Sequence, residues 1–170
     1  MFKKALLAAI LFFFCTSLFS QNDTNDSIST YYLIRHAEKN RSNPADKNPD
    51  LTHKGVLRAL HWRQLFEQFP LDAIYSTNYK RTMHTALPTA KSKNLNIKTY
   101  HPFKIDFQQF LKDTKGKNVL IVGHSNTIPT FANKLIGKEI YQTIEDTNNT
   151  NLYIVTINGD KISFVLVKTK

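Results

Sequence analysis

Two histidines of this chain stand just beyond strongly apolar, strand-like runs of residues. His36 comes shortly after residues 30–34 (TYYLI), and His124 comes shortly after residues 119–122 (VLIV). Short apolar, β-rich runs of this kind predict buried strands, and open α/β sheets bind ligands beyond the carboxyl ends of their strands. We therefore expect the two imidazoles at one functional edge of a sheet. A neutral imidazole is a competent nucleophile near neutral pH, because its unperturbed pKa is about 6.5.

Two arginines are predicted to join the histidines. Arg35 directly precedes His36, and Arg81 lies in the segment that follows a third short strand-like run, residues 73–75 (AIY). A guanidinium is a permanent cation whose planar fork binds two phosphate oxygens at once. Phosphoryl transfer depends mainly on positioning and on positive charge around the equatorial oxygens. This set of side chains therefore indicates a site for a phosphoryl dianion.

The segments that carry these residues resemble the motifs of the histidine phosphatase superfamily, which has the phosphoglycerate mutase-like fold. The motifs occur in the family's order, over about residues 31–136. They are residues 33–39 (LIRHAEK), similar to the Arg-His-Gly signature; residues 51–55 (LTHKG), similar to Leu-Thr-x-x-Gly; residues 74–77 (IYST) followed by Arg81; and residues 122–127 (VGHSNT), similar to the second-histidine motif. Ala37 stands where the family usually has glycine, which narrows the allowed backbone angles.

The resemblance implies a role for each of the four residues. His36 would attack phosphorus and carry a phosphohistidine intermediate, which water then hydrolyses. Arg35, Arg81 and His124 would hold the phosphoryl oxygens and stabilise the charge of the transition state. No metal or organic cofactor is expected, because the remaining histidines lack the spacing of metal ligands. The alternative is a non-catalytic module on the same fold that binds phosphate or phosphoproteins with the same cations.

The acid that protonates the leaving group is harder to assign. Family members of this branch usually place a Glu or Asp after the second-arginine helix, and Asp106 is the nearest candidate by order. Asp106 is equally suited to capping a short helix. Glu38 and Glu145 are weaker candidates. Without such an acid, the enzyme would favour substrates with good leaving groups, such as phosphoramidates or acyl phosphates.

Three further residues are candidates for the lining of the pocket. His84 lies one helical turn past Arg81. Asn126 and Thr127 follow His124, where they could donate hydrogen bonds to phosphate or cap the next helix. Both interpretations of Asn126 and Thr127 remain open at this point.

Strand-like and helix-like segments alternate along the chain, which predicts a three-layer α/β/α sandwich around a mostly parallel sheet. Helices are expected over residues 51–69, 79–93, 106–112 and 127–136. Further strands are expected over residues 97–100, 152–157 and 162–167, the last two joined as a C-terminal hairpin by an Asn-Gly turn. In the first helix, the apolar residues recur at helical spacing and are expected on its apolar face, and Trp62 is expected in the core. These apolar residues are Val56, Leu57, Leu60, Leu65, Phe66 and Phe69.

The first twenty residues have the sequence pattern of a secretory signal peptide. Lys3 and Lys4 precede an apolar run over residues 5–15, which is short for a transmembrane span. The expected organisation is a signal peptide over 1–20, a flexible leader over 21–29 and a histidine phosphatase domain over 30–170. The protein would then be exported, periplasmic or secreted, without membrane association after cleavage. An uncleaved N-terminal anchor is the alternative.

Cysteine usage and charge narrow the function classes. Cys15 is the only cysteine, so a cleaved chain would have no disulfide and no cysteine nucleophile, which excludes the cysteine-based phosphatases. The net charge of +10 favours anionic partners, here a phosphorylated small molecule or a phosphoprotein. The lysines are scattered and form no basic-aromatic stripe, so no specific nucleic-acid partner is expected.

Overall fold

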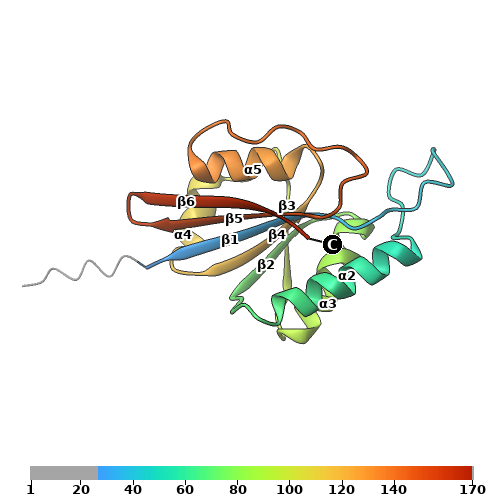
Figure 1. Cartoon of the computed structure of the whole chain (residues 1–170), viewed down its shortest axis with the longest axis horizontal. Helices are drawn as coiled ribbons and strands as arrows, with labels where there is room; N and C mark the ends of the chain where they lie inside the picture. Colours follow the sequence, from blue (N-terminus) through green and yellow to red (C-terminus); the bar gives the residue numbers. More distant parts are fainter. Residues whose placement is uncertain (1–26, 170) are drawn as a thin grey trace, which may run out of the picture.

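The computed structural model describes residues 27–169, which form a six-stranded sheet covered by helices (Figure 1). The strand order is β3-β2-β4-β1-β5-β6. The strands are β1 (Ser29–Arg35), β2 (Ala73–Thr77), β3 (Ile97–Tyr100), β4 (Asn118–Gly123), β5 (Asn151–Asn158) and β6 (Lys161–Lys168). The first four strands pair in parallel, whereas β5 pairs antiparallel with β1 and β6 pairs antiparallel with β5. The predicted mostly parallel sheet with a C-terminal hairpin is confirmed.

Helices cover both faces of the sheet and complete the three predicted layers. Helices α2 (His53–Phe66) and α3 (Lys80–Ser92) lie on one face, and α4 (Phe107–Asp113) and α5 (Thr127–Ile136) lie on the other (Figure 1). Successive residues of β1 point to opposite faces, as a pleated strand requires. Tyr32 packs in the core cluster with Trp62 of α2, whereas Tyr31 packs in the cluster with Phe110 of α4 and Phe131 of α5.

The apolar face of α2 differs from the prediction. Val56, Leu57 and Leu60 are 47%, 54% and 42% exposed. The helix buries Gly55, Ala59, Trp62 and Phe66. The prediction is therefore confirmed for Phe66, and Leu65 and Phe69 pack partly buried against the same core cluster. Trp62 is confirmed as a core residue, because it is fully buried. The large rings of Trp62 and Phe66 join the core cluster on this face of the sheet, and α2 packs most extensively against α3.

The Leu-Thr-x-x-Gly segment fastens α2 to the chain just after β1. The Thr52 hydroxyl accepts a hydrogen bond from the Gly55 amide at 3.0 Å and so caps the helix. The Thr52 amide donates to the Glu38 carbonyl at 2.8 Å. A Cβ atom on Gly55 would lie 2.2 Å from that same carbonyl oxygen, so only glycine fits there. This packing holds the segment around His36 against the first helix.

The predicted signal peptide lies outside the described residues, as does all of the predicted leader except its last three positions. Within the described part of the chain, β1 already begins at Ser29. None of the helices in residues 27–169 is long and apolar enough to span a bilayer.

Candidate active site

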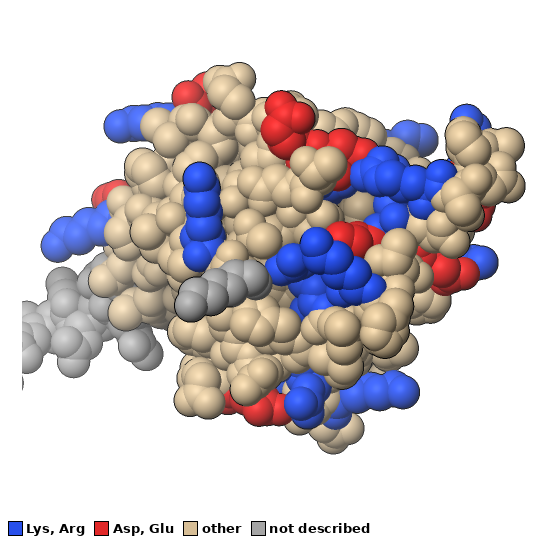
Figure 2. All heavy atoms as spheres, turned by 45° about the vertical axis from the view of Figure 1, so that its right-hand side comes forward, with Lys and Arg blue, Asp and Glu red and all other residues tan. Residues whose placement is uncertain are grey.

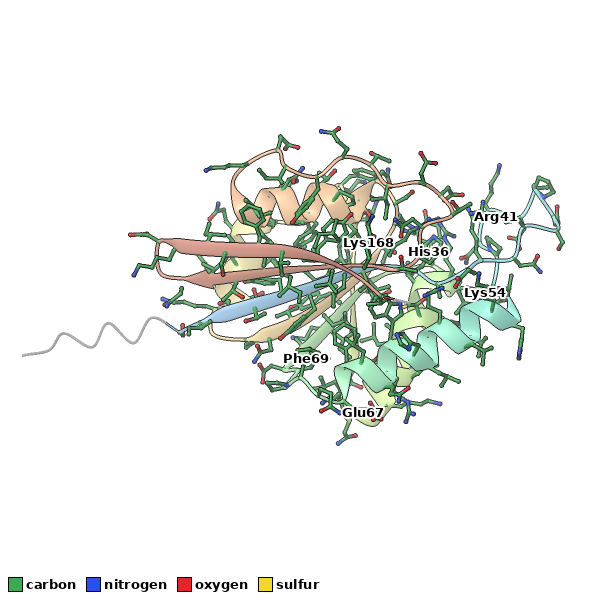
Figure 3. The ribbon with its side chains drawn as sticks, viewed as in Figure 1. His36, Arg41, Lys54, Glu67, Phe69 and Lys168 are labelled. Carbon is green, nitrogen blue, oxygen red and sulfur yellow. The ribbon has the colours of Figure 1, made fainter. Side chains whose placement is uncertain are left out.

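The two predicted histidines meet at the carboxyl ends of β1 and β4. These neighbouring strands are parallel, with Arg35 opposite Gly123 in their register. The His36 amide donates to the Gly123 carbonyl at 3.0 Å, and the imidazole centroids of His36 and His124 lie 5.6 Å apart. Figure 3 shows His36 beyond the sheet, on the side of the molecule where the loops gather.

The imidazole of His36 is held as a neutral ring with a defined tautomer. Its Nδ1 lies 2.7 Å from the Ala37 carbonyl oxygen, which can only accept, so Nδ1 carries the proton and Nε2 keeps its lone pair. The Asn149 amide donates to the His36 carbonyl at 2.7 Å and fixes the backbone. Burial lowers the pKa of His36 to about 3, and nearby positive charge adds to this effect. The result is an unprotonated nitrogen suited to nucleophilic attack.

Arg35 is buried and is clamped by the loop that precedes β5. Its Nη1 donates to the carbonyls of Glu145 and Asn148 at 2.9 and 3.2 Å, and its Nη2 pairs with the Asp146 carboxylate. The same carboxylate also pairs with Arg41. The remaining donor, Arg35 Nε, is buried without a hydrogen-bond partner among residues 27–169. A buried N–H donor without a partner is costly, so Nε is suited to receive a substrate oxygen.

Arg81 is aimed at the histidines by an aromatic ring. Its guanidinium carbon lies 4.4 Å from the centroid of the Tyr79 ring, an arrangement that fixes the plane of the fork. The same ring meets the His124 imidazole edge to face at 5.1 Å. Arg81 Nε and Nη1 are buried and lack hydrogen-bond partners in the described part of the chain. Three unpartnered guanidinium nitrogens, counting Arg35 Nε, therefore belong to the site.

A chain of hydroxyl groups orients His124. Its Nε2 lies 2.9 Å from the Thr77 hydroxyl, which donates onward to the Thr82 hydroxyl at 3.0 Å. Nε2 must therefore donate to Thr77, and Nδ1 is left facing Arg81 Nη2 at 3.4 Å. Burial, together with the positive charges of Arg81 and Arg35, lowers the pKa of His124 to about 4. Both histidines are thus neutral near pH 7.

Thr85 joins the two arginine motifs. Its hydroxyl accepts from the Ala37 amide at 2.9 Å and donates to the Arg81 carbonyl at 2.6 Å. Ala37 itself is fully buried. One hydroxyl thereby couples the backbone next to the nucleophile to the helix that carries the second arginine.

A cleft of about 510 Å³ opens beside Arg81 and His124. Its lining consists of Thr77, Asn78, Tyr79, Arg81, Thr99, Tyr100, His101, Pro102, Phe103, His124, Asn126 and Thr127. No Asp or Glu belongs to this lining in the described part of the chain. Figure 2 turns this end of the molecule forward and shows basic side chains grouped on it, with acidic ones beside them. Such positive charge draws anionic ligands toward the cleft.

The predicted acid and the predicted extra histidine are not brought into the cleft. Asp106 is exposed, accepts from the Gln109 amide at 3.0 Å and caps α4. His84 is half exposed and pairs with Asp50 at 3.1 Å. Neither residue belongs to the cleft lining. The capping interpretation of Asp106 is confirmed. His84, which the sequence placed in the pocket because it follows Arg81 by one turn, lies instead on the outer side of α3.

The other candidates divide between the cleft and its support. Asn126 lines the cleft, and its side chain makes no capping bond to α5. The Thr127 hydroxyl accepts from the His124 amide at 3.0 Å and so shapes the turn after β4. Glu38 pairs with Arg58 at 2.9 Å, and Glu145 contributes only its carbonyl to Arg35.

Sequence reasoning missed three residues that organise the site. Tyr79 orients Arg81 and His124, Asp146 pairs with Arg35, and Asn149 holds the His36 backbone. Tyr79 comes two residues after the end of β2, and its place so close to Arg81 is a signal that could have been used. Asp146 and Asn149 lie in a polar loop more than one hundred residues from their partners, and no local pattern marks them.

The lowered histidine pKa values predict acid sensitivity of the fold. As pH falls below 6.5, the unfolded chain protonates both imidazoles, whereas the folded protein does so only near pH 3 for His36 and pH 4 for His124. The free energy of unfolding should therefore fall by up to about 1.4 kcal/mol per pH unit for each histidine. Urea unfolding between pH 6.5 and 5 measures this slope. His124→Gln should remove about half of it, and an unchanged slope in that variant would contradict the assignment.

No group of three or more His, Cys, Asp or Glu side chains arranged to hold a metal occurs in residues 27–169.

Comparisons with known proteins point to one family. The family model described as histidine phosphatase superfamily (branch 1) matches residues 31–104. Phosphoserine phosphatase 1 of Hydrogenobacter thermophilus is 40% identical over 70 residues, which cover 38% of this chain and 33% of that protein. The chain therefore matches about a third of the length of this curated relative.

Solved structures share the fold over most of both chains. The phosphoglycerate mutase from Bacillus anthracis superposes with a TM-score of 0.63 at 16% identity, covering 84% of this chain and 94% of that one. The protein histidine phosphatase SixA, complexed with tungstate, superposes with a TM-score of 0.65 at 13% identity, covering 82% and 96%. The family model and the common fold agree in what they indicate: residues 31–104 are similar to the histidine phosphatase superfamily, and the solved structures share the fold of the chain.

Proposed function

We propose that this protein is a phosphatase that hydrolyses phosphate monoesters or phosphoramidates through a phosphohistidine intermediate on His36. The observation that carries the proposal is the unprotonated Nε2 of the buried His36 imidazole near Arg35 and Arg81. Together these arginines have three buried nitrogens without hydrogen-bond partners among residues 27–169. A phosphoryl group placed between them meets a nucleophile on one side and hydrogen-bond donors around its oxygens. Positioning and electrostatic stabilisation of this kind supply most of the catalysis of phosphoryl transfer.

In the first step, His36 Nε2 forms a bond to phosphorus while the bond from phosphorus to the leaving atom breaks. Arg35 and Arg81 donate to the phosphoryl oxygens as their charge rearranges. In the second step, water attacks the phosphohistidine, the N–P bond breaks, and Nε2 regains its lone pair. Inorganic phosphate is released, and the proton stays on His36 Nδ1 throughout, donated to the Ala37 carbonyl.

The leaving group receives little help from the protein. No carboxylate lines the cleft in the described residues, and the Asp106 side chain is engaged at the start of α4. Leaving groups that depart as stable anions, or that are already protonated, should therefore react fastest. This supports phosphoramidates and esters of acidic alcohols as substrates.

The names of similar proteins support phosphorylated small molecules or phosphoproteins as substrates. One relative is named a phosphoserine phosphatase, and one structural neighbour is named a protein histidine phosphatase. The second candidate function is a phosphate-binding module without turnover. The clamped Arg35 and the lack of a carboxylate in the described cleft lining favour this alternative.

Turnover of aryl phosphates of graded acidity tests the proposal. p-Nitrophenyl phosphate should be hydrolysed, and kcat should fall steeply from p-nitrophenyl to phenyl phosphate because no side chain protonates the departing oxygen. Tungstate binding, followed in parallel by calorimetry, shows that the site is intact. Binding of tungstate without any turnover of p-nitrophenyl phosphate would establish the module instead.

We also propose that the catalytic domain spans residues 30–170 and that the protein is exported to the periplasm or secreted. The support is the charged and apolar pattern of residues 1–20. N-terminal sequencing of the protein recovered from outside the cytoplasm tests this. A start close to Gln21 is expected, and an intact Met1 on a membrane-bound protein would favour an anchor.

A further inference from the structure

The cleft beside Arg81 and His124 is far larger than a phosphoryl group. Its cationic end occupies one side, whereas the rest of the lining is aromatic or uncharged, including Tyr79, Tyr100 and Phe103. We infer that this part of the cleft binds a flat, aromatic leaving group that carries an anionic end. The inference rests on the proposed phosphatase function and names the substrate class for it.

Phe103 provides an exposed aromatic surface at the rim of the cleft. Its side chain is 76% exposed, the highest value among the large apolar residues in the described part of the chain. The Phe103 amide donates to His101 Nδ1 at 3.3 Å, and the two rings lie 6.1 Å apart at 64°. The Lys104 amide also donates to the His101 carbonyl at 3.1 Å. A turn therefore holds the ring in place, ready to stack on a planar group.

A second cavity of about 210 Å³ continues the cleft past this ring. The two share Pro102, Phe103, Asn126 and Thr127 in their linings. Ile105 and Phe131 add apolar surface to the second cavity. Phe131 is 4% exposed and packs edge to face against the ring of Tyr100 at 5.9 Å. The extension therefore has a rigid apolar wall and leads away from the catalytic histidines.

The combined site, made of both cavities, has a basic side chain in each cavity. Arg81 stands in the first cavity and Lys134 in the second, and no carboxylate lines either one in residues 27–169. Lys134 is exposed on the last turn of α5 and forms no ion pair within the described residues. A molecule with a phosphoryl group at one end and a carboxylate at the other fits both cations, with its ring lying between them.

The chemistry of the leaving group agrees with this shape. An aromatic oxygen or ring nitrogen departs as a stabilised species and needs less protonation than an alkyl oxygen. The cleft offers no carboxylate acid within its described lining. Aryl phosphates and aromatic phosphoramidates with an acidic end are therefore the class that both the surface and the chemistry select.

Three phosphate esters test the inference. The first is 3-(4-hydroxyphenyl)propanoate phosphorylated on its phenol oxygen, and the second is the same phosphate with its carboxylate methylated. The third is hexafluoroisopropyl phosphate, an alkyl ester whose alcohol is about as acidic as the phenol. Phe103→Ala should lower the aryl-to-alkyl ratio of kcat/KM about tenfold, because a stacked ring is worth about one factor of ten. Phe103→Tyr should restore it. Lys134→Gln should remove the preference for the free carboxylate over its methyl ester, whereas Lys138→Gln, outside both linings, should keep it.

Equal losses on aryl and alkyl esters in Phe103→Ala, or an unchanged carboxylate preference in Lys134→Gln, would overturn the inference while leaving the phosphatase function intact. If no ester is hydrolysed, the binding of phosphonates still tests the aromatic subsite separately from the phosphatase function. Calorimetry with phenylphosphonate and methylphosphonate should show tighter binding of the aryl compound and loss of that difference in Phe103→Ala. Equal affinities would overturn the aromatic subsite even in a non-catalytic protein.

Discussion

Replacement of His36 with asparagine should lower kcat by at least about 10⁴-fold, because loss of a catalytic nucleophile is rarely compensated by the rest of a site. The asparagine amide can still donate toward the Ala37 carbonyl, which His36 Nδ1 contacts at 2.7 Å in the native protein. No lone pair would then stand where Nε2 stands. Steady-state hydrolysis of p-nitrophenyl phosphate, with the released phenolate followed by absorbance, measures the loss.

Tungstate binding provides the control for this variant. The guanidinium donors of Arg35 and Arg81 are unchanged, so the dissociation constant should stay within a few-fold of the native value. His36→Asn that keeps more than a tenth of native kcat would show that another group attacks phosphorus. Loss of tungstate binding in His36→Asn would instead indicate that the site has collapsed. The same measurements would then be made on His36→Gln.

Arg81→Ala should lower kcat/KM by about 10³-fold, the size of effect seen when an arginine that stabilises a phosphoryl transition state is removed. Two of its nitrogens are buried without partners in the described residues, and its fork lies over the Tyr79 ring. Lysine should fail to restore activity, since an ammonium cannot present the planar fork or stack in the same way. Initial rates over a range of substrate concentrations separate the effect on kcat from that on KM.

Lys80→Ala is the matched control for Arg81. Lys80 neighbours Arg81 in sequence, but its exposed ammonium pairs with Asp50 at 3.3 Å on the surface. Its removal should change kcat/KM less than threefold, since surface ion pairs contribute little. Similar losses in the two variants would show that general positive charge, and not the position of the Arg81 fork, drives the reaction.

The strand ends could be predicted from the sequence because the physics is local. Apolar β-rich runs such as residues 30–34 and 119–122 can only be buried, and parallel neighbours bring their following residues together. His36 and His124 therefore met as expected, and Arg81 followed from the strand before it. The helices and the C-terminal hairpin were predictable for the same reason, from periodicity and the Asn-Gly turn.

Side-chain direction and long-range polar contacts could not be predicted in this way. Helical spacing alone does not say which of two stripes on α2 is buried, and Val56, Leu57 and Leu60 lie on the exposed one. Spacing also did not separate the inner and outer sides of α3, where His84 pairs with Asp50. The clamp on Arg35 depends on Asp146, 111 residues later in the chain, and only the folded topology brings the two together.

The most direct test of the account is to locate the phosphoryl group during turnover. The native protein is mixed with a ³²P-labelled aryl phosphate and quenched in base within milliseconds. It should carry an acid-labile label, and tandem mass spectrometry of its peptides should place that label on His36. His36→Asn should carry none. A label on any other residue, or no labelled protein while hydrolysis proceeds at the native rate, would contradict the central role of His36.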